Sequence, residues 1–299
     1  MVGCGWAQEV RRPAITGLAY VRFYESDMPA AKHFYGEWLG LHETDDSKGG
    51  SSFAVGMRQR IEIAPLSAGT KSRLASVGFL TKDVGGMRRY LEAHGLKVEA
   101  VDADEIDVRD PEGNLMAFVG ERRAAAETAG AGGKVRGTEM VAAGKAGAPT
   151  ARRMIHAGFK VRSRETEDKF YREVLGFRPY WHGGMQPDRT DWVSLQVPEG
   201  SDWIEYMLQG GEHPSQKELG VLDHTSLGVE HMPDVTAQLI ANGMTDPEMR
   251  KSQIGKDGKW QLNVFDPDLT RVEFMEFKPV RPACCSEVTA KHPEPGEGQ

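Results

Sequence analysis

The feature that most constrains the fold of this chain is an internal repeat. The motif Phe34-Tyr35-x3-Leu39-Gly40 returns without a gap as Phe170-Tyr171-x3-Leu175-Gly176. In both copies the apolar residues have helical spacing, and the glycine stands where a helix ends. A strand-like segment precedes each motif, at residues 18–23 and 155–161. Because a long-period repeat constrains the fold more than any single window, the two halves are expected to share one fold.

A second, shorter period divides each half again. Residues 77–95 and 224–243 repeat the order of strand and then helix. Each of these units ends in strand patterns around an Asp-Pro turn, at Asp110-Pro111 and Asp266-Pro267. The sequence therefore predicts four units of strand, helix and about three strands, arranged as two pairs.

The length of 299 residues suits two domains with cores of their own. A region rich in Ala and Gly between the halves predicts a linker, and a C-terminal region rich in Pro, Glu and Gly predicts a disordered tail. The expected organisation is an N-terminal segment at 1–14, a first domain at 15–121, a linker at 122–151, a second domain at 152–278 and a tail at 279–299.

The first eight residues, MVGCGWAQ, are small and apolar and look like the end of a signal-peptide cleavage site. The charged start and the long apolar stretch of such a peptide are missing. Two interpretations stay open, a short disordered N-terminus or a start inside a longer signal peptide. The first predicts a cytoplasmic protein, and the second a periplasmic or exported one.

Composition excludes several classes of function. The formal net charge is -7 without a dense Lys/Arg stripe, which argues against binding of nucleic acid, and no apolar run is long enough to span a membrane. The three cysteines, Cys4, Cys284 and Cys285, are too few for a disulfide framework or a thiolate metal cage. The expected partner is a small-molecule substrate. Four units on one chain can complete a site, so a monomer is feasible, and a homodimer is the alternative.

Four residues of the second half form two repeats of a His/Glu pair. His156 and His224 open strand patterns and lie 68 residues apart, as do Glu205 and Glu273 on the last strands of their units. Equivalent positions converge on the axis of a pseudo-twofold sheet, and two imidazoles with two carboxylates there would bind a divalent ion. The alternative interpretation is ordinary core histidines and glutamates that face solvent.

The first half serves as an internal control. Alignment of the repeats pairs each candidate ligand with a first-half residue: Tyr20 with His156, Glu62 with Glu205, Ser76 with His224 and Ala117 with Glu273. Three of the four ligands are thus missing from the first half. We expect no metal there but a structural role, with a metal-free binding pocket as the alternative.

The repeated Phe-Tyr-x3-Leu-Gly motif and the segment from Asp266 to Phe274 resemble those of the vicinal oxygen chelate superfamily. This superfamily includes glyoxalase I, bleomycin-resistance proteins and extradiol dioxygenases, and the resemblance covers both halves. It implies an α+β fold of four βαβββ modules, paired into two cupped mixed β-sheets. It also implies a metal inside the cup, because His156, Glu205, His224 and Glu273 match the usual ligand positions.

The ligand set looks most like that of glyoxalase I, which implies a lyase or isomerase that works through an enediolate. One divalent ion is expected (Zn, Ni, Fe, Mn or Co), with Glu273 or Glu205 as the base. The implied substrate is a small oxygenated molecule, such as a lactoylglutathione-type thiohemiacetal. His182, in the Tyr180–Gly184 segment, is a candidate substrate contact.

Two rival functions stay open. An Fe(II) extradiol-type dioxygenase would also have its metal in the second half only. Against it, the family motif has a Tyr where this chain has Asn263, no His lies between His231 and His292, and Glu205 would add a fourth ligand. The other rival is a binding protein without catalysis, although such family members usually lack the metal ligands.

Overall fold

The structure is a computed structural model that describes residues 10–44, 49–70, 72–100, 102–129 and 147–296. Its first half contains two successive βαβββ modules. The first comprises β1 (Ile15–Glu25), α1 (Met28–Lys32) continued by the π-helical turn η1 (His33–Trp38), β2 (His42–Thr44), β3 (Ser51–Ala54) and β4 (Arg60–Pro65). The next comprises β5 (Leu74–Thr81), α2 (Val84–Ala93), β6 (Val98–Ala100), β7 (Glu105–Arg109) and β8 (Leu115–Gly120), and is followed by α3 (Glu121–Ala129).

The second half repeats this order. Its first module comprises β9 (Met154–Lys160), α4 (Arg164–Asp168) continued by η2 (Lys169–Val174), β10 (Arg178–Gly183), β11 (Trp192–Gln196) and β12 (Trp203–Met207). After α5 (Gln216–Leu222), its second module comprises β13 (His224–Val229), α6 (Met232–Ala241), the 3-10 turn η3 (Glu248–Arg250), β14 (Gln253–Ile254), β15 (Trp260–Phe265) and β16 (Arg271–Glu276). The predicted α+β fold of four βαβββ modules is confirmed.

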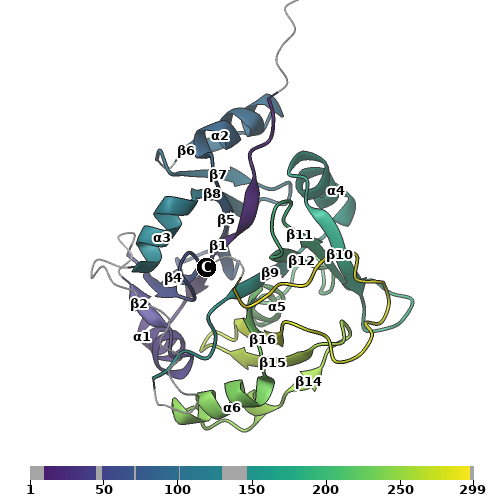
Figure 1. The fold of residues 1–299 in the computed structure, drawn as a ribbon. Coiled ribbons are helices and arrows are strands. Elements are labelled where there is room, and N and C mark those ends of the chain that lie inside the picture. The colour runs from purple at the N-terminus through teal and green to yellow at the C-terminus, as the bar shows by residue number, and fades with distance from the viewer. Residues whose placement is uncertain (1–9, 45–48, 71, 101, 130–146, 297–299) are drawn as a thin grey trace, which may run out of the picture.

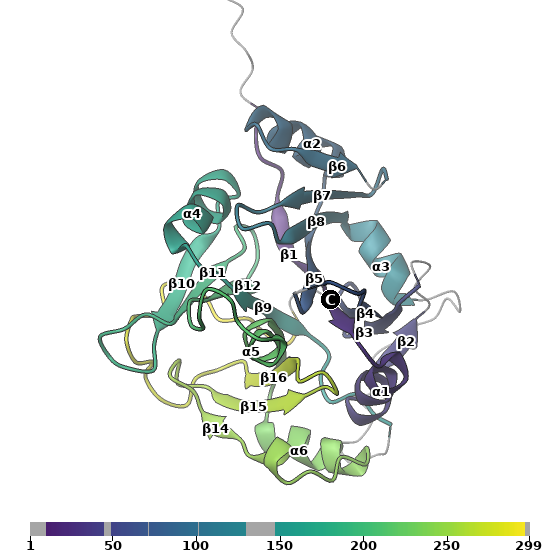
Figure 2. The same cartoon turned by 180° about the vertical axis from the view of Figure 1, so that it is seen from behind.

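Each half forms one mixed sheet of eight strands (Figures 1 and 2). The orders are β2-β3-β4-β1-β5-β8-β7-β6 and β10-β11-β12-β9-β13-β16-β15-β14. In both sheets the first strands of the two modules pair antiparallel at the centre, and each pairs in parallel with the last strand of its own module. The repeat therefore places equivalent residues of the two modules next to one another.

The repeated motifs also hold the halves together. The Tyr35 hydroxyl of the first motif donates to the Asp266 carboxylate of the second half at 3.1 Å. Tyr171 donates in the same way to Asp110 of the first half at 3.2 Å. Gly40 and Gly176 end their helices with φ values of 65° and 76°, a left-handed conformation that favours glycine. The Phe-Tyr-x3-Leu-Gly motif thus ends a helix and contacts the Asp-Pro turn of the other half.

The structure corrects the expected linker at 122–151. Most of α3 lies in this range, and its residues Ala124 and Thr128 are buried. Residues 147–151 are also placed, and the Thr150 amide donates to the Leu39 carbonyl at 3.0 Å. The sequence interpretation missed the helix because its alanines were taken as too small to pack. Residues 130–146 lie outside the described part.

The expected tail at 279–299 is corrected as well for residues 279–296, which we call the C-terminal strap. Its backbone bonds to the second half, with Val280 donating to Gly258 at 2.9 Å and Thr289 donating to Tyr180 at 2.9 Å. The adjacent Cys284 and Cys285 form a disulfide within it. Backbone hydrogen bonds to β10 and to the turn before β15 fix this segment, and they cannot be inferred from its polar composition.

The predicted N-terminal segment at 1–14 falls mostly on residues outside the described part, which begins at residue 10. None of the described helices has the length and apolar character needed to cross a membrane.

Candidate metal centre

The four predicted ligands lie on four neighbouring strands at the centre of the second sheet. Strand register groups them into two adjacent rows across one face. His156 pairs with Ser226, which pairs in turn with Glu273, and this forms the first row. Gly158 pairs with both Glu205 and His224, and this forms the second. A Cβ on Gly158 would come within 1.9 Å of the His224 ring, so this position needs glycine.

Three of the ligands converge closely. His156, His224 and Glu273 each offer a ligand atom within 4.8 Å of the others. The two Nε2 atoms lie 3.0 Å apart, and Glu273 Oε2 lies 3.4 Å from His156 Nε2. Glu205 Oε2 lies 3.6 Å from His224 Nε2, and its other oxygen accepts from Ser194 at 3.3 Å. Glu205 therefore borders the three-residue cluster from the His224 side.

Burial sets the protonation of these groups. It lowers the pKa of both histidines well below the ordinary value, which keeps them neutral. It raises the pKa of Glu205 to about 8 and that of Glu273 to about 7. Around neutral pH both imidazoles can thus offer a lone pair, and both carboxylates can exchange a proton.

Neighbouring groups orient the imidazoles. His224 Nδ1 lies 2.8 Å from the Leu222 carbonyl, so Nδ1 carries the proton and Nε2 presents its lone pair to the cluster. The Trp203 ring lies against His156 with centroids 4.7 Å apart. Arg271 Nη2 lies 2.9 Å from His224 Nε2 and donates to this lone pair. A cationic group thus lies at the ligand atom of His224, and an ion bound to His224 Nε2 would take the lone pair that Arg271 uses in this structure.

These residues fit a divalent ion. Metal–ligand bonds of about 2.0–2.2 Å put neighbouring ligand atoms about 3.0–3.5 Å apart. The separations of 3.0 and 3.4 Å within the three-residue cluster fall in that range, and the 3.6 Å between Glu205 and His224 lies just above it. Two neutral imidazoles with carboxylates suit Zn, Ni, Fe, Mn or Co. His156, His224 and Glu273 would hold the ion, with Glu205 as the fourth candidate.

The cluster borders a cavity of about 350 Å³ in the second cup. Its aromatic wall consists of Tyr180, Trp181, Trp192 and Trp203. Its acidic side chains are Glu205, Asp257 and Glu273, and its basic side chains are Lys256, Lys259, Arg271 and Arg281. Val288 and His292 of the strap also line it, so the strap forms part of its wall.

The predicted substrate contact His182 is not among the residues that line this cavity. It is exposed on β10, where its backbone N–H donates to Ser286 Oγ of the strap at 2.9 Å. The histidine that does line the cavity is His292, whose Nδ1 lies 2.5 Å from the Tyr180 hydroxyl. Sequence reasoning missed His292 because the strap was taken as a disordered tail.

Lys259 is a second cavity residue that is not among the candidates chosen from the sequence. It precedes Gln261 and Asn263 by two and four residues, and all three line the cavity. Asn263 pairs with Glu273 across β15 and β16. The period-two alternation of a strand, extended back from Asn263, is the signal that could have found it.

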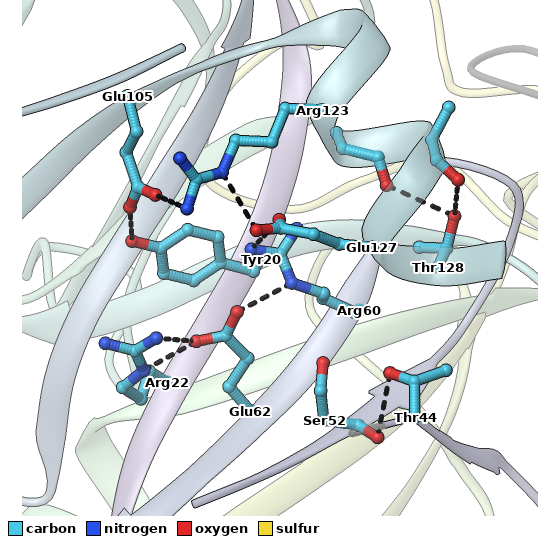
Figure 3. Close-up of polar contacts among 12 residues, drawn as sticks. Tyr20, Arg22, Thr44, Ser52, Arg60, Glu62, Glu105, Arg123, Glu127 and Thr128 are labelled. Carbon is cyan, nitrogen blue, oxygen red and sulfur yellow. Dashed lines mark hydrogen bonds and ion pairs between the residues drawn. The ribbon is translucent and has the colours of Figure 1, made fainter. Parts of the chain in front are cut away.

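The first cup has the same strand register but different side chains at the equivalent positions. Tyr20 pairs with Gly78, which pairs with Ala117, and this row is equivalent to the row of His156 and Glu273. Arg22 pairs with both Glu62 and Ser76, and this row is equivalent to the row of Glu205 and His224. These pairings confirm the alignment made from the sequence. Glu62 accepts from Arg60 Nε at 2.6 Å and also from Arg22 (Figure 3).

Helix α3 lies over this first cup. Its Arg123 contacts Glu105 at 2.9 Å, and Glu105 accepts from the Tyr20 hydroxyl at 3.0 Å (Figure 3). Its Glu127 contacts Arg60 at 2.7 Å. Where the second cup has its histidines and carboxylates, the first cup thus has a buried network of ion pairs covered by a helix.

Comparison with known proteins agrees with this architecture. Residues 153–274 match the family model of the Glyoxalase/Bleomycin resistance protein/Dioxygenase superfamily. No curated protein matches the chain in sequence.

Similar solved structures cover both halves. They include an extradiol ring-cleaving dioxygenase from B. fuscum (TM-score 0.64, 18% identity, 94% of this chain and 76% of that one). They also include a catechol 2,3-dioxygenase (TM-score 0.63, 15% identity, 93% of both chains). A variant of homoprotocatechuate 2,3-dioxygenase from Brevibacterium fuscum matches as well (TM-score 0.63, 19% identity, 89% of this chain and 72% of that one). At these identities the likeness establishes the fold.

Proposed function

Residues 153–274 belong to the glyoxalase/bleomycin resistance protein/dioxygenase superfamily, and from that premise we propose that this protein is a divalent-metal-dependent lyase or isomerase. It would act through an enediolate on a small substrate with two adjacent oxygens, as glyoxalase I does. One observation carries the proposal. Two imidazoles and two carboxylates share one face of the second cup, and the fourth of them, Glu205, lies 3.6 Å from His224.

A bound divalent ion would supply Lewis-acid polarisation of the two substrate oxygens. The remaining chemistry falls to this chain's carboxylates. In the ion-free site burial raises the pKa of Glu205 to about 8 and that of Glu273 to about 7, and a bound cation would lower both. A carboxylate that is ionised at neutral pH in the loaded site can serve as a general base. Either carboxylate can therefore take the proton from the carbon beside the oxygens and return it to the neighbouring carbon. We assign the base to Glu273, with Glu205 as its pseudo-symmetric partner.

The walls of the cavity would position the substrate. Trp181 and Trp192 stack with centroids 6.5 Å apart, and the Trp203 ring contacts both His156 and Tyr180. These rings exclude water from one side of the reacting carbons, which strengthens electrostatic interactions within the site.

The second candidate function is Fe(II)-dependent ring cleavage of a catechol. Two specific observations favour it, the likeness of the whole chain to extradiol dioxygenases and the aromatic cavity wall. A tyrosine and a histidine do line the cavity, Tyr180 and His292, and both come from parts of the sequence outside the extradiol motif. In this reading three ligands suffice and Glu205 is dispensable.

The experiment that separates these functions compares Glu205→Gln with the unchanged protein. Elemental analysis first establishes whether the purified chain holds a divalent ion. A lyase or isomerase loses turnover on methylglyoxal with glutathione, or on related α-hydroxycarbonyls, in Glu205→Gln. Solvent deuterium also enters the product of the unchanged enzyme. Glu62→Gln, the equivalent change in the first cup, is the matched control and keeps turnover.

Stoichiometric oxygen uptake with catechols on the Fe(II)-loaded protein, retained in Glu205→Gln, would replace the lyase assignment with ring cleavage. A chain that takes up no divalent ion would contradict both reactions and leave a binding protein without catalysis.

A further inference from the structure

Lys259 is a buried cation whose charge the described residues leave largely unpaired. It is 1% exposed, yet it lines the cavity beside the metal cluster. Its Nζ donates one long hydrogen bond, to the Tyr180 hydroxyl at 3.4 Å, and forms no ion pair with a carboxylate of the described residues. Its other contacts are ring faces, with the Trp203 centroid 5.0 Å and the Tyr180 centroid 5.8 Å away. Two of its three N–H donors are thus available to a ligand.

The carboxylate of Asp257, which acts on Lys259, bonds to groups other than its ammonium. Asp257 is the carboxylate that acts most strongly on Lys259. Its Oδ1 accepts from the Lys259 backbone N–H at 3.2 Å and from Gln261 Nε2 at 3.2 Å. The carboxylate therefore shapes the turn before β15. Burying a cation without a partner is costly, and a site that binds an anion recovers that cost when the anion arrives.

The other charged side chains of the cavity also favour an anionic ligand. Once Glu205 and Glu273 are committed to a divalent ion, four basic side chains face the single acid Asp257. Arg271 Nε is buried and has no hydrogen-bond partner among the described residues. Lys256 and Arg281 are exposed and solvated, whereas Lys259 is buried, so it is Lys259 that a neutral substrate would leave without a counter-charge and an anionic one would pair with.

We propose that the substrate carries a carboxylate besides its two adjacent oxygens, and that Lys259 binds this carboxylate between Trp203 and Tyr180. The inference rests on the proposed function, because it places the two oxygens at the metal cluster and the carboxylate at Lys259. It adds a substrate class, a carboxylated vicinal diol, catechol or hydroxycarbonyl. Lys259 is then a specificity-determining residue, and it takes no part in proton transfer.

The test uses redox-inert zinc-loaded protein and three chelating probes. 3,4-Dihydroxybenzoate and 3,4-dihydroxyphenylacetate carry a carboxylate at two distances from the diol, and 4-methylcatechol carries none. Binding is followed by calorimetry and by quenching of tryptophan fluorescence, since three tryptophans line the cavity. We expect at least one carboxylated probe to bind about 10- to 100-fold more tightly than 4-methylcatechol. Lys259→Met, which keeps the length of the side chain, should remove that preference and leave 4-methylcatechol unchanged.

Lys217→Met, an exposed change on α5, is the matched control and should keep the preference. If the unchanged protein binds all three probes with equal affinity, the carboxylate inference is overturned. This comparison needs no variant, and it leaves the proposed chelation of the two adjacent oxygens unaffected. Zinc-dependent binding of 4-methylcatechol supports chelation of two adjacent oxygens, the step on which the proposed function depends. A third result is that the carboxylated probes bind, lose that binding in Lys259→Met, and 4-methylcatechol does not bind at all. This result would support the role of Lys259 and contradict chelation by the metal. Absence of binding by all three probes overturns both.

Discussion

The two cups of this protein share a strand order and a register but are closed in different ways. In each half the last strand is followed by a segment that turns back over its own sheet. After β8 this segment is α3, whose Arg123 and Glu127 enter the ion-pair network of the first cup. After β16 it is the C-terminal strap, which bonds along β10 and leaves a cavity of about 350 Å³.

The comparison separates what the shared fold does from what the residues on it do. At the row that holds His156 and Glu273, the first half has Tyr20 and Ala117, and neither is a nitrogen or carboxylate ligand. Glu62, the one retained carboxylate, pairs with Arg22 and Arg60 instead of bordering imidazoles. One scaffold thus supports a candidate metal centre in one half and a structural core in the other.

The largest expected effect is on metal content. His224→Ala should reduce the divalent ion from about one per chain to near zero, because it removes a ligand from the centre of the cluster. Ser76→Ala, the equivalent change in the first cup, should leave metal content unchanged. Elemental analysis after dialysis checks both. Two ions per chain, or loss of metal in Ser76→Ala, would show that the cups do not differ as described.

The next effect is on stability and belongs to the first cup. Arg60→Met removes one partner of Glu62, which keeps Arg22, and one partner of Glu127, which keeps Arg123, and should lower the free energy of unfolding by about 2 kcal/mol. Adding Glu62→Leu should restore part of that loss, since the buried carboxylate is then gone. Urea denaturation of chelator-treated protein measures both. A neutral Arg60→Met would mean that the network does not stabilise the first half.

A pH effect is expected in the second cup. In the metal-free protein, burial raises the pKa of Glu205 to about 8 and that of Glu273 to about 7, so both hold protons at pH 6. An incoming ion must displace these protons, and metal affinity should therefore rise with pH until about pH 8. The expected slope is about tenfold per pH unit for each proton displaced. Zinc titrations between pH 6 and 8.5 test this, and a flat profile would mean that both carboxylates are already ionised.

The smallest effect concerns the contacts that join the halves. Tyr35→Phe and Tyr171→Phe each remove one buried hydrogen bond to a carboxylate of the other half. Each should lower the free energy of unfolding by about 1.5 kcal/mol, with similar values because the contacts are equivalent. Thermal unfolding of the two variants measures the pair. A much larger loss for one of them would show that the halves depend on this exchange unequally.

The sequence by itself determined the repeated architecture and the residues of the candidate centre. Three features of the repeat depend only on neighbouring residues and can be recognised from the sequence. They are the helical spacing after Phe34 and Phe170, the glycine at each helix end and the Asp-Pro turn in each half. His156 and His224 lie 68 residues apart, as do Glu205 and Glu273, and this repeat identified the candidate ligands. Strand register then brought His156, His224 and Glu273 together as the repeat implied.

Only the tertiary structure decided how each cup is covered and what lines it. The strap and α3 have polar or small residues with no strong pattern, and they are held by backbone hydrogen bonds and ion pairs to strands far away in the sequence. For the same reason His292, rather than His182, lines the cavity, and Lys259 is buried beside Trp203. Long-range contacts of this kind depend on where two distant segments meet, and a sequence read one window at a time does not contain that information.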